Sequence, residues 1–403
     1  MKHKTTHTPA PNVSSQVPST HTPVPQSQLR IAIVHDWLTN MGGAEPLVLE
    51  LHKLYPDAPI YTSVYDRKKM TAFAGCDVRT TYLQKLIPSF LRYKHILWPV
   101  LRAHAFRRLD MSKYDLIISS STAEAKAVKK RPDATHICYC NTPTRYYWSH
   151  YKEFKESFHF GIFNIFIRPV IPPFVWWMRK LDLQAAAGVD YFIANSNEVK
   201  RRIKKYYERD STVIFPSVEV ARFSNPSTQY PIPSPIKPRS GFIMWGRHVP
   251  YKKFDLAIEA CNQIGAKLTV VGTGPETEKL KKLAGPTVSF TGRVSDKELV
   301  ELAHSAEAFL FPGDEDFGIA PVEAIAAGTP IIAYKSGGAL DYVIEGTTGT
   351  FFNDQTVESL VTALKNFKPE NYNQKILQAF ATKFSTQNFR NQISDFVNSH
   401  IEK

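Results

Sequence analysis

Two stretches of the chain open in the same way, and this repetition constrains the fold more than any other feature. Residues 30–37, RIAIVHDW, form a short run rich in Ile and Val, and a glycine pair and an apolar-periodic segment follow it. Residues 241–248, GFIMWGRH, are again strand-like and precede FDLAIEACNQI, whose apolar residues recur at helical spacing. Further apolar runs alternate with helical segments, namely YDLIISSS, THICYC, YFIANS, STVIFP, KLTVVGTG, VSFTGRV, AFLFPG and PIIAY.

Continuous apolar strands between helices are typical of parallel sheets that are covered on both faces. We therefore predict an α/β protein with two doubly wound, Rossmann-like domains that face each other across a cleft. Ligands of such domains bind at the carboxyl ends of the strands.

A proline-rich stretch separates the two halves. Residues 216–241, PSVEVARFSNPSTQYPIPSPIKPRSG, have the composition of a linker. Residues 1–28 are rich in Thr, Pro, Ser and His, hold no apolar stretch resembling a signal sequence, and are interpreted as a disordered leader. The predicted division is a leader at 1–28, a first, acceptor-binding domain at 29–215, a linker at 216–240, a second, nucleotide-sugar-binding domain at 241–370, and C-terminal helices at 371–403 that pack back towards the first domain.

The apolar and cysteine patterns favour a cytoplasmic protein. The longest apolar region, residues 160–178, contains Arg168 and three prolines, which disfavours a transmembrane helix. The four cysteines form no CxxC pair, and no histidine cluster accompanies them at zinc-site spacing. Cys138 and Cys140 alternate with Tyr139, so we expect them to share an apolar face of one strand. A reducing compartment is therefore expected.

Nearly all of the basic excess lies in the first half. Residues 29–215 hold 29 Lys and Arg against 17 Asp and Glu, whereas residues 216–403 hold 19 against 20, within a total net charge of +13. Cationic residues interleave with large apolar ones between 82 and 110, which favours peripheral contact with an anionic membrane. The cations of this predicted patch are Lys85, Arg92, Lys94, Arg102, Arg107 and Arg108. The alternative is core helices with a solvated basic face. No recognised nucleic-acid-binding module accompanies the patch, so nucleic acid is not an expected partner.

An acidic motif, GDEDFGIAPVEAIAAGTP at residues 313–330, places Glu315 and Glu323 eight residues apart. Proline is favoured at the first position of a helix, so we expect a helix that begins near Pro321. Glu315 would then lie on the incoming loop and Glu323 on the first turn. The two carboxylates would contact different parts of one elongated, polar ligand.

Two cations follow the first strand of the second domain. A guanidinium at Arg247 and an ammonium at Lys252 suit a diphosphate, although two cations on a surface loop are the simpler alternative. Gly337 and Gly338 precede another helix, where backbone N–H groups can bind an anion. The acidic run 314–316 invites a magnesium or manganese site. The cations already supply that charge, and acids before a helix are favoured by its dipole, so no metal is expected.

These motifs together resemble a known family. Gly42-Gly43, Gly246-Arg247 with Lys252, and Glu315 to Glu323, in that order, are similar to retaining glycosyltransferases of family 4, which have the GT-B fold. The segments HDWLTNMGGAE, CYCNTPTRYYW, VPYKKFDLAIEA, TGRVSDKEL and EDFGIAPVEAIAAGTPIIAYKSGGALDYV resemble the mannosyltransferases that build bacterial surface polysaccharides. The resemblance covers about residues 29–395.

The resemblance implies a role for each motif. Arg247 and Lys252 would hold the donor diphosphate, Glu323 would bond the ribose hydroxyls, and Gly43 beside Gly42 would approach the phosphate or the acceptor. The transferred sugar would contact Glu315 and the backbone of Phe317, Gly318 and Ile319, and the base would lie beside Arg293 and Val294. Two positions depart from the family pattern, because Asn141 stands where the family usually has His and Ser149 where it usually has Asp. Asn can donate a hydrogen bond but cannot carry charge or relay a proton, so activity could be altered.

The resemblance also implies a reaction. Mannose would move from GDP-mannose to a hydroxyl of a glycan or lipid-linked glycan, with no cofactor and no metal, by a cytoplasmic enzyme at the inner face of the membrane. A UDP-sugar donor is one alternative. Another GT-B reaction, such as that of a phosphorylase or an epimerase, is a second, although no lysine lies in a recognisable pyridoxal-phosphate motif. A binder of nucleotide-sugars or anionic polymers with weak or no activity, because of Asn141, is the third.

Overall fold

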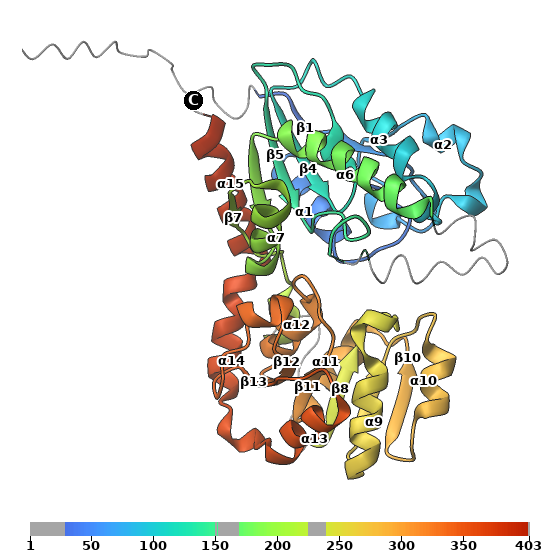
Figure 1. The fold of residues 1–403 in the computed structure, drawn as a ribbon. Coiled ribbons are helices and arrows are strands. Elements are labelled where there is room, and N and C mark those ends of the chain that lie inside the picture. Colours follow the sequence, from blue (N-terminus) through green and yellow to red (C-terminus); the bar gives the residue numbers. More distant parts are fainter. Residues whose placement is uncertain (1–28, 150, 152–168, 225–238, 402–403) are drawn as a thin grey trace, which may run out of the picture.

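The first lobe of the molecule is built on a seven-stranded parallel sheet (Figure 1). The computed structural model describes residues 29–149, 151, 169–224 and 239–401, so the predicted leader lies outside the described residues. The strand order is β3-β2-β1-β4-β5-β6-β7. The strands are β1 (Ile31–His35), β2 (Ile60–Thr62), β3 (Val78–Thr80), β4 (Leu116–Ser121), β5 (Thr135–Cys140), β6 (Tyr191–Ala194) and β7 (Ser211–Val213). The helices are α1 (Glu45–Leu54), α2 (Leu83–Leu86), α3 (Pro99–Arg107), α6 (Ile171–Ala187) and α7 (Asn197–Tyr207).

The second lobe repeats this topology with six strands. The order is β10-β9-β8-β11-β12-β13, again parallel throughout. The strands are β8 (Phe242–Trp245), β9 (Leu268–Val271), β10 (Val288–Gly292), β11 (Ala308–Phe311), β12 (Ile331–Tyr334) and β13 (Gly349–Phe352). The helices are α8 (Val220–Ser224), α9 (Phe254–Ile264), α10 (Thr277–Leu283), α11 (Asp296–Ser305), α12 (Ile319–Ala326), α13 (Val357–Asn366), α14 (Gln374–Ala381) and α15 (Thr386–Ile401). Short 3-10 turns include η3 (Ser89–Leu91), η4 (His95–Leu97), η5 (Ala125–Ala127), η7 (Pro250–Lys252) and η8 (Gly337–Asp341).

Both sheets reverse their strand order next to their first strand. In the first sheet β1 lies between β2 and β4, and in the second β8 lies between β9 and β11. Chain crossovers run to opposite sides at such a point, which leaves a crevice at the carboxyl ends of the two central strands. The predicted residues Gly42 and Gly43 follow β1, Arg247 and Lys252 follow β8, and Glu315 follows β11.

The central strands are buried along their whole length, as the apolar runs predict. Every residue of β1, β4 and β11 is buried, and the register pairs Ile33 of β1 with Ile60 and Ile118 of its two neighbours. Cys138 and Cys140 are buried in one cluster with Phe192 of β6, which confirms that they share an apolar face. All four cysteines are free thiols.

The segments that join and follow the two sheets differ in part from the predicted linker and tail. Residues 220–224, predicted as linker, form α8, and Phe223 is buried in the core of the second domain. The linker prediction is wrong there because Val220 and Phe223 are both buried in that core and dock the short helix. Residues 225–238 of the predicted linker lie outside the described residues. In the tail, α14 packs on the second domain through Leu377, so the prediction that residues 371–403 return to the first domain does not hold for α14.

The last helix alone returns to the first domain. The red helix α15 in Figure 1 runs beside the first lobe, and Phe389, Ile393, Phe396 and Val397 are buried in its core. Arg390 also donates a hydrogen bond to Glu50 of α1 at 2.7 Å. None of the helices within the described residues combines the length and the apolar character that crossing a bilayer requires.

Candidate active site

The predicted residues of the second domain meet in a pair that joins two strand-end loops. The Lys252 Nζ atom, in the turn after β8, donates to Oε1 of Glu315, in the loop after β11, at 2.5 Å. The two side chains are only 17% and 14% exposed. Burial by itself lowers the pKa of Lys252, but the charge of Glu315 more than offsets this effect, and the pKa is raised. Lys252 is therefore a partly buried cation at neutral pH.

The backbone around Lys252 has an unusual conformation. Lys253, the next residue, has φ of 55°, a left-handed conformation that a residue other than glycine rarely adopts. Backbone of this kind occurs often in ligand-binding loops. The 3-10 turn η7 and this left-handed residue together carry the chain from β8 into α9. Arg247, earlier in the same loop, is exposed, and within the described residues it makes no hydrogen bond or ion pair.

The helix after the acidic motif begins earlier than predicted. α12 starts at Ile319, so Pro321 is its third residue and Glu323 lies on the second turn instead of the first. Pro321 is tolerated there because the N–H groups of the first turn have no partner inside the helix. Gly318 precedes the helix with φ of 87°, and a Cβ atom at this position would lie 2.7 Å from the Phe311 ring. A glycine is therefore required at 318, and no side chain caps the helix.

Glu323 is held by two donors. Its Oε1 accepts from Arg222 Nη2 of α8, and its Oε2 accepts from Trp245 Nε1 at the end of β8, both at 3.0 Å. Burial raises the pKa of Glu323, and the Arg222 charge partly counteracts the shift. Each carboxylate oxygen has a second lone-pair direction, so both can still accept from ligand hydroxyls. Arg222 lies in the predicted linker, and no sequence signal identified it.

Gly337 and Gly338, predicted to offer N–H groups to an anion, are the first two residues of η8, and the N–H of Gly338 is not free. The N–H of Gly338 donates to the Glu315 carbonyl oxygen at 2.8 Å. A Cβ atom at Gly338 would lie 2.3 Å from the Cα atom of Phe317. The pair therefore permits close packing of two loops. Phe317 itself is buried, and its carbonyl oxygen accepts from Tyr342 Oη at 2.9 Å.

The acidic run 314–316 is largely neutralised by cations. Glu315 pairs with Lys252, and Asp316 pairs with Arg145 and Arg202 of the first domain. Burial raises the pKa of Asp314. Among the described residues no group of three His, Cys, Asp or Glu side chains has a geometry suited to a metal ion.

A chain of contacts in the first domain joins two predicted residues. Asn141, directly after β5, donates through Nδ2 to Ser120 Oγ at 3.1 Å. The Ser120 carbonyl oxygen lies 3.2 Å from Nδ1 of the buried His35, and Nε2 of His35 lies 3.7 Å from Glu45. Burial lowers the pKa of His35, but Glu45 outweighs this and leaves the pKa raised. Glu45 in turn accepts from the Gly42 N–H at 2.7 Å.

Gly43 brings the two domains into contact. A Cβ atom at Gly43 would lie 3.8 Å from Cδ1 of Ile319. Gly43 of the first domain therefore lies near the start of α12, the helix that follows the loop of Glu315. Arg293 and Val294 follow the edge strand β10, two strands away from β8; Arg293 is exposed, and Val294 packs partly on the core.

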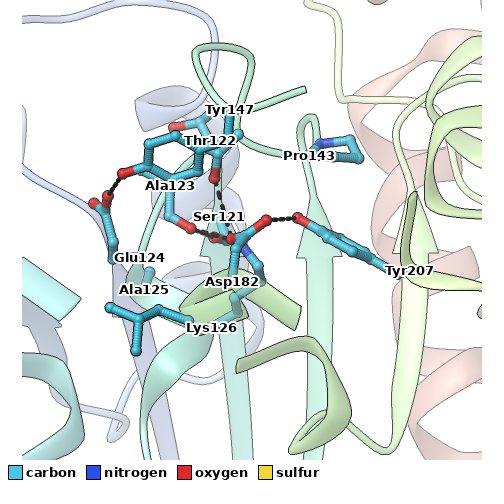
Figure 2. A network of polar contacts seen from close by, with 12 residues as sticks. Ser121, Thr122, Ala123, Glu124, Ala125, Lys126, Pro143, Tyr147, Asp182 and Tyr207 are labelled. Carbon is cyan, nitrogen blue, oxygen red and sulfur yellow. Dashed lines mark hydrogen bonds and ion pairs between the residues drawn. The ribbon is translucent and has the colours of Figure 1, made fainter. Parts of the chain in front are cut away.

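A buried polar network supports the loop after β5 (Figure 2). Asp182 of α6 forms an ion pair with Lys126 at 2.6 Å and accepts from Tyr207 Oη at 2.8 Å. Tyr147 Oη donates to Glu124 at 3.0 Å, as the dashed line in Figure 2 marks. Buried polar groups that are fully paired fix one arrangement of the chain. The network therefore holds the segment between Asn141 and Tyr147 in place.

Comparison with known proteins finds the same resemblance as the motifs. Residues 233–383 match the family model of glycosyl transferases group 1. Anabaena Alr3699/HepE, solved in complex with UDP, superposes with a TM-score of 0.64 over 91% of this chain and 100% of that chain, at 18% identity. The fold is GT-B. The resemblance to family 4 glycosyltransferases is confirmed.

Curated relatives of this GT-B protein include mannosyltransferases. The GDP-mannose-dependent alpha-(1-6)-phosphatidylinositol monomannoside mannosyltransferase of Mycobacterium tuberculosis is 35% identical over 144 residues, 31% of this chain and 37% of the relative. The match thus spans well under half of that protein. Alpha-1,3/1,6-mannosyltransferase ALG2 of Dictyostelium discoideum is 23% identical over 92% of this chain and 98% of its own length.

Proposed function

We propose that the protein is a retaining, metal-independent hexosyltransferase that moves mannose from GDP-mannose to a hydroxyl of a glycan or lipid-linked glycan in cell-surface polysaccharide synthesis. The observation that carries the proposal is the Lys252–Glu315 pair at the end of β8 and β11, with Glu323 on the helix that follows. Lys252 is a cation that can bind a diphosphate, and Glu315 and Glu323 are carboxylates that can bind hydroxyl groups. All three follow the carboxyl ends of β8 and β11. This arrangement suits a sugar joined to a nucleoside diphosphate.

The mechanism follows from where charge develops. Departure of the nucleoside diphosphate places negative charge on the β-phosphate, and preorganised cations stabilise it there. Lys252 and the exposed Arg247 would supply that charge. Donor binding would draw Lys252 from Glu315 to the phosphate and free the Glu315 carboxylate to accept from sugar hydroxyls. Retention would follow from attack on the face that the leaving phosphate vacates, with that phosphate taking the acceptor proton.

The choice of GDP-mannose rests on relatives whose names state that donor, one of which matches at 35% identity. A UDP-sugar donor is the second candidate, because the structural neighbour HepE was solved with UDP. A panel of radiolabelled GDP- and UDP-sugars, incubated with lipid-linked and free glycan acceptors in the presence of EDTA, tests the proposal. Transfer of label from GDP-mannose alone, undiminished by EDTA, is expected. Transfer only from UDP-sugars would replace the donor, and no transfer from any sugar nucleotide would refute the proposed function.

The acceptor side carries the proposed membrane contact, with one correction. Arg102 is buried in an ion pair with Glu124, so it is not part of any surface patch. Arg92 and Arg107 donate to backbone carbonyl oxygens and are half-buried. Exposed apolar residues do gather beside the exposed cations on α2 and the turns after it; they are Leu86, Phe90 and Leu97, with Lys85 and Lys94. We call these five residues the α2 face. Trp176 and Trp177 of α6 are exposed as well.

A further inference from the structure

The loop between β11 and α12 is held by both domains. We call residues 313–318 the donor loop. From its own domain Lys252 binds the Glu315 side chain, and the Gly338 N–H binds the Glu315 carbonyl oxygen. From the first domain two arginines reach the next residue, Asp316. Glu315, which is proposed to contact the sugar, therefore lies next to Asp316, whose side chain is bound by the other domain.

Both oxygens of Asp316 are occupied by first-domain cations. Arg145 Nε donates to Oδ2 at 3.0 Å, and a second nitrogen of the same guanidinium contacts that oxygen. Arg202 Nη1 donates to Oδ1. The Asp316 side chain is 8% exposed and that of Arg202 11%. Charge-assisted pairs of this kind are directional and strong, and removing one partner leaves a buried charge uncompensated.

Each arginine is fixed within the first domain. Arg202 lies on α7, where its Nε donates to Glu198 at 2.8 Å. Arg145 lies in the segment after Asn141 that the buried network of Figure 2 supports. The start of α7 makes a second contact with the other domain, because Asn197 donates to Asp341 of η8 through its backbone N at 3.0 Å and through Nδ2 at 2.6 Å. The Asp316 pairs thus belong to a continuous junction.

We propose that Asp316, Arg145 and Arg202 form a positioning device that locks the donor loop onto the acceptor domain and so couples domain closure to sugar transfer. The device deepens the proposed function and rests on it. We assign Asp316 no contact with the donor, because its two oxygens are directed to Arg145 and Arg202 of the first domain. It acts through its neighbour: the lock sets where Glu315 and the Gly318 backbone lie relative to Gly43 and Asn141. Completing a site by domain closure is a common way to couple binding to catalysis.

The variant Asp316→Asn tests the proposal, because it removes the charge of the side chain and keeps its shape. We expect kcat to fall at least tenfold, because the donor loop is no longer fixed against the acceptor. The affinity for GDP, measured by calorimetry, should stay within twofold, because Arg247, Lys252 and Glu323 all lie in the second domain. The radius of gyration from small-angle X-ray scattering should increase as the domains separate. Arg201→Gln is the matched control, since Arg201 is exposed on the same helix and pairs with Glu198.

A second variant guards against misfolding. Arg145→Gln leaves the Asp316–Arg202 pair intact and removes a side chain that is 29% exposed, so its expected loss of kcat is smaller than that of Asp316→Asn. The proposal is overturned if kcat is unchanged in both variants, if the scattering is unchanged, or if GDP affinity falls along with kcat. A wild type that transfers no sugar would refute the proposed function. The scattering comparison would still decide whether the lock holds the domains.

Discussion

Glu323 is a carboxylate that two donors of its own domain hold in place. Arg222 and Trp245 hold its two oxygens from α8 and β8, so its position is set before any ligand arrives. Burial raises the pKa of this carboxyl, and the charge of Arg222 and the Trp245 hydrogen bond act against that shift. A preorganised acceptor of this kind loses little freedom when it binds hydroxyl groups.

Replacing Glu323 with Ala should weaken the binding of GDP and GDP-mannose. A hydrogen bond to a charged group contributes about 1.5–3 kcal/mol, or roughly ten- to a hundredfold in affinity. Isothermal calorimetry measures this change, and Glu278→Ala, an exposed acid of the same domain, is the control. Unchanged affinity in a folded Glu323→Ala variant would remove this residue from the donor site.

The buried His136 should make folding stability depend on pH. The imidazole Nε2 atom forms a hydrogen bond with Ser119 Oγ at 2.8 Å, and burial lowers the pKa of His136 to about 4. Between pH 6.5 and 4 the unfolded chain binds a proton that the folded chain does not, so stability falls as the pH drops through that window. At pH 5 the loss attributable to this group is about 2 kcal/mol, from 1.36 kcal/mol per pKa unit.

Urea unfolding at pH 7 and pH 5 tests this expectation. The wild type should lose about 2 kcal/mol more than His136→Asn between the two pH values, since carboxylates common to both proteins contribute equally. Equal losses in the two proteins would show that His136 already titrates near its ordinary pKa in the folded state.

At the residue scale, the local sequence pattern identified side chains that directly follow strands. It did not identify the residues with which those side chains pair. Lys252 and Glu315 stand next to apolar runs, and that position alone suggested a site. Arg145 and Arg202 pair with Asp316 across 171 and 114 residues of sequence, and nothing near them in the chain signals the contact. Long-range pairing depends on the fold, so local sequence pattern could not supply it.

At the scale of elements, the composition of a run decided more than its length. β7, with three residues, and β11 and β12, with four each, were predicted, whereas β2 and β3, with three each, and β13, with four, were missed. β3 contains Arg79 and β13 begins with Gly349 and Thr350, so neither is a continuous apolar run. The start of α12 was placed two residues late for another reason, because proline fits any position of the first turn.

Gly318, which directly precedes α12, should resist substitution more than an ordinary turn glycine. Gly318→Ala would combine a left-handed backbone with a Cβ atom 2.7 Å from Phe311. Gly346→Ala would have the same kind of backbone, at φ of 70°, with open space around the new atom. The backbone alone costs about 1–3 kcal/mol, and steric overlap adds to it. Chemical denaturation should therefore show the larger loss for Gly318→Ala, and equal losses would mean that the packing there is loose.

At the scale of the molecule, the two lobes have different surfaces. The positive charge of the sequence belongs to the first lobe, as counted from its residues, and the α2 face places Phe90 and Leu97 at 72% and 55% exposure next to lysines. Exposed apolar residues beside cations suit the headgroup region of an anionic bilayer. The structure corrects the membership of the predicted basic patch, because Arg102 is turned inward to Glu124.

The protein should therefore bind anionic vesicles and not neutral ones, and salt should weaken the binding. Replacing Phe90 and Leu97 with Ser should release it from phosphatidylglycerol vesicles in a sedimentation assay and leave its affinity for GDP unchanged. Ile376→Ser, which alters an equally exposed residue of the second lobe, is the control. Sedimentation of the double variant at the wild-type level would show that the α2 face does not carry the membrane contact.

The return of α15 to the first lobe has a consequence for biosynthesis. Phe389 and Phe396 meet Tyr139 and Tyr191, residues made some 200 or more positions earlier in the chain. While the second lobe is being translated, the nascent first lobe carries an uncovered apolar groove where α15 will later lie. Ribosome-bound chains arrested before residue 386 should therefore recruit chaperones and be cleaved by protease within that lobe. Protection should come only when the last helix leaves the exit tunnel.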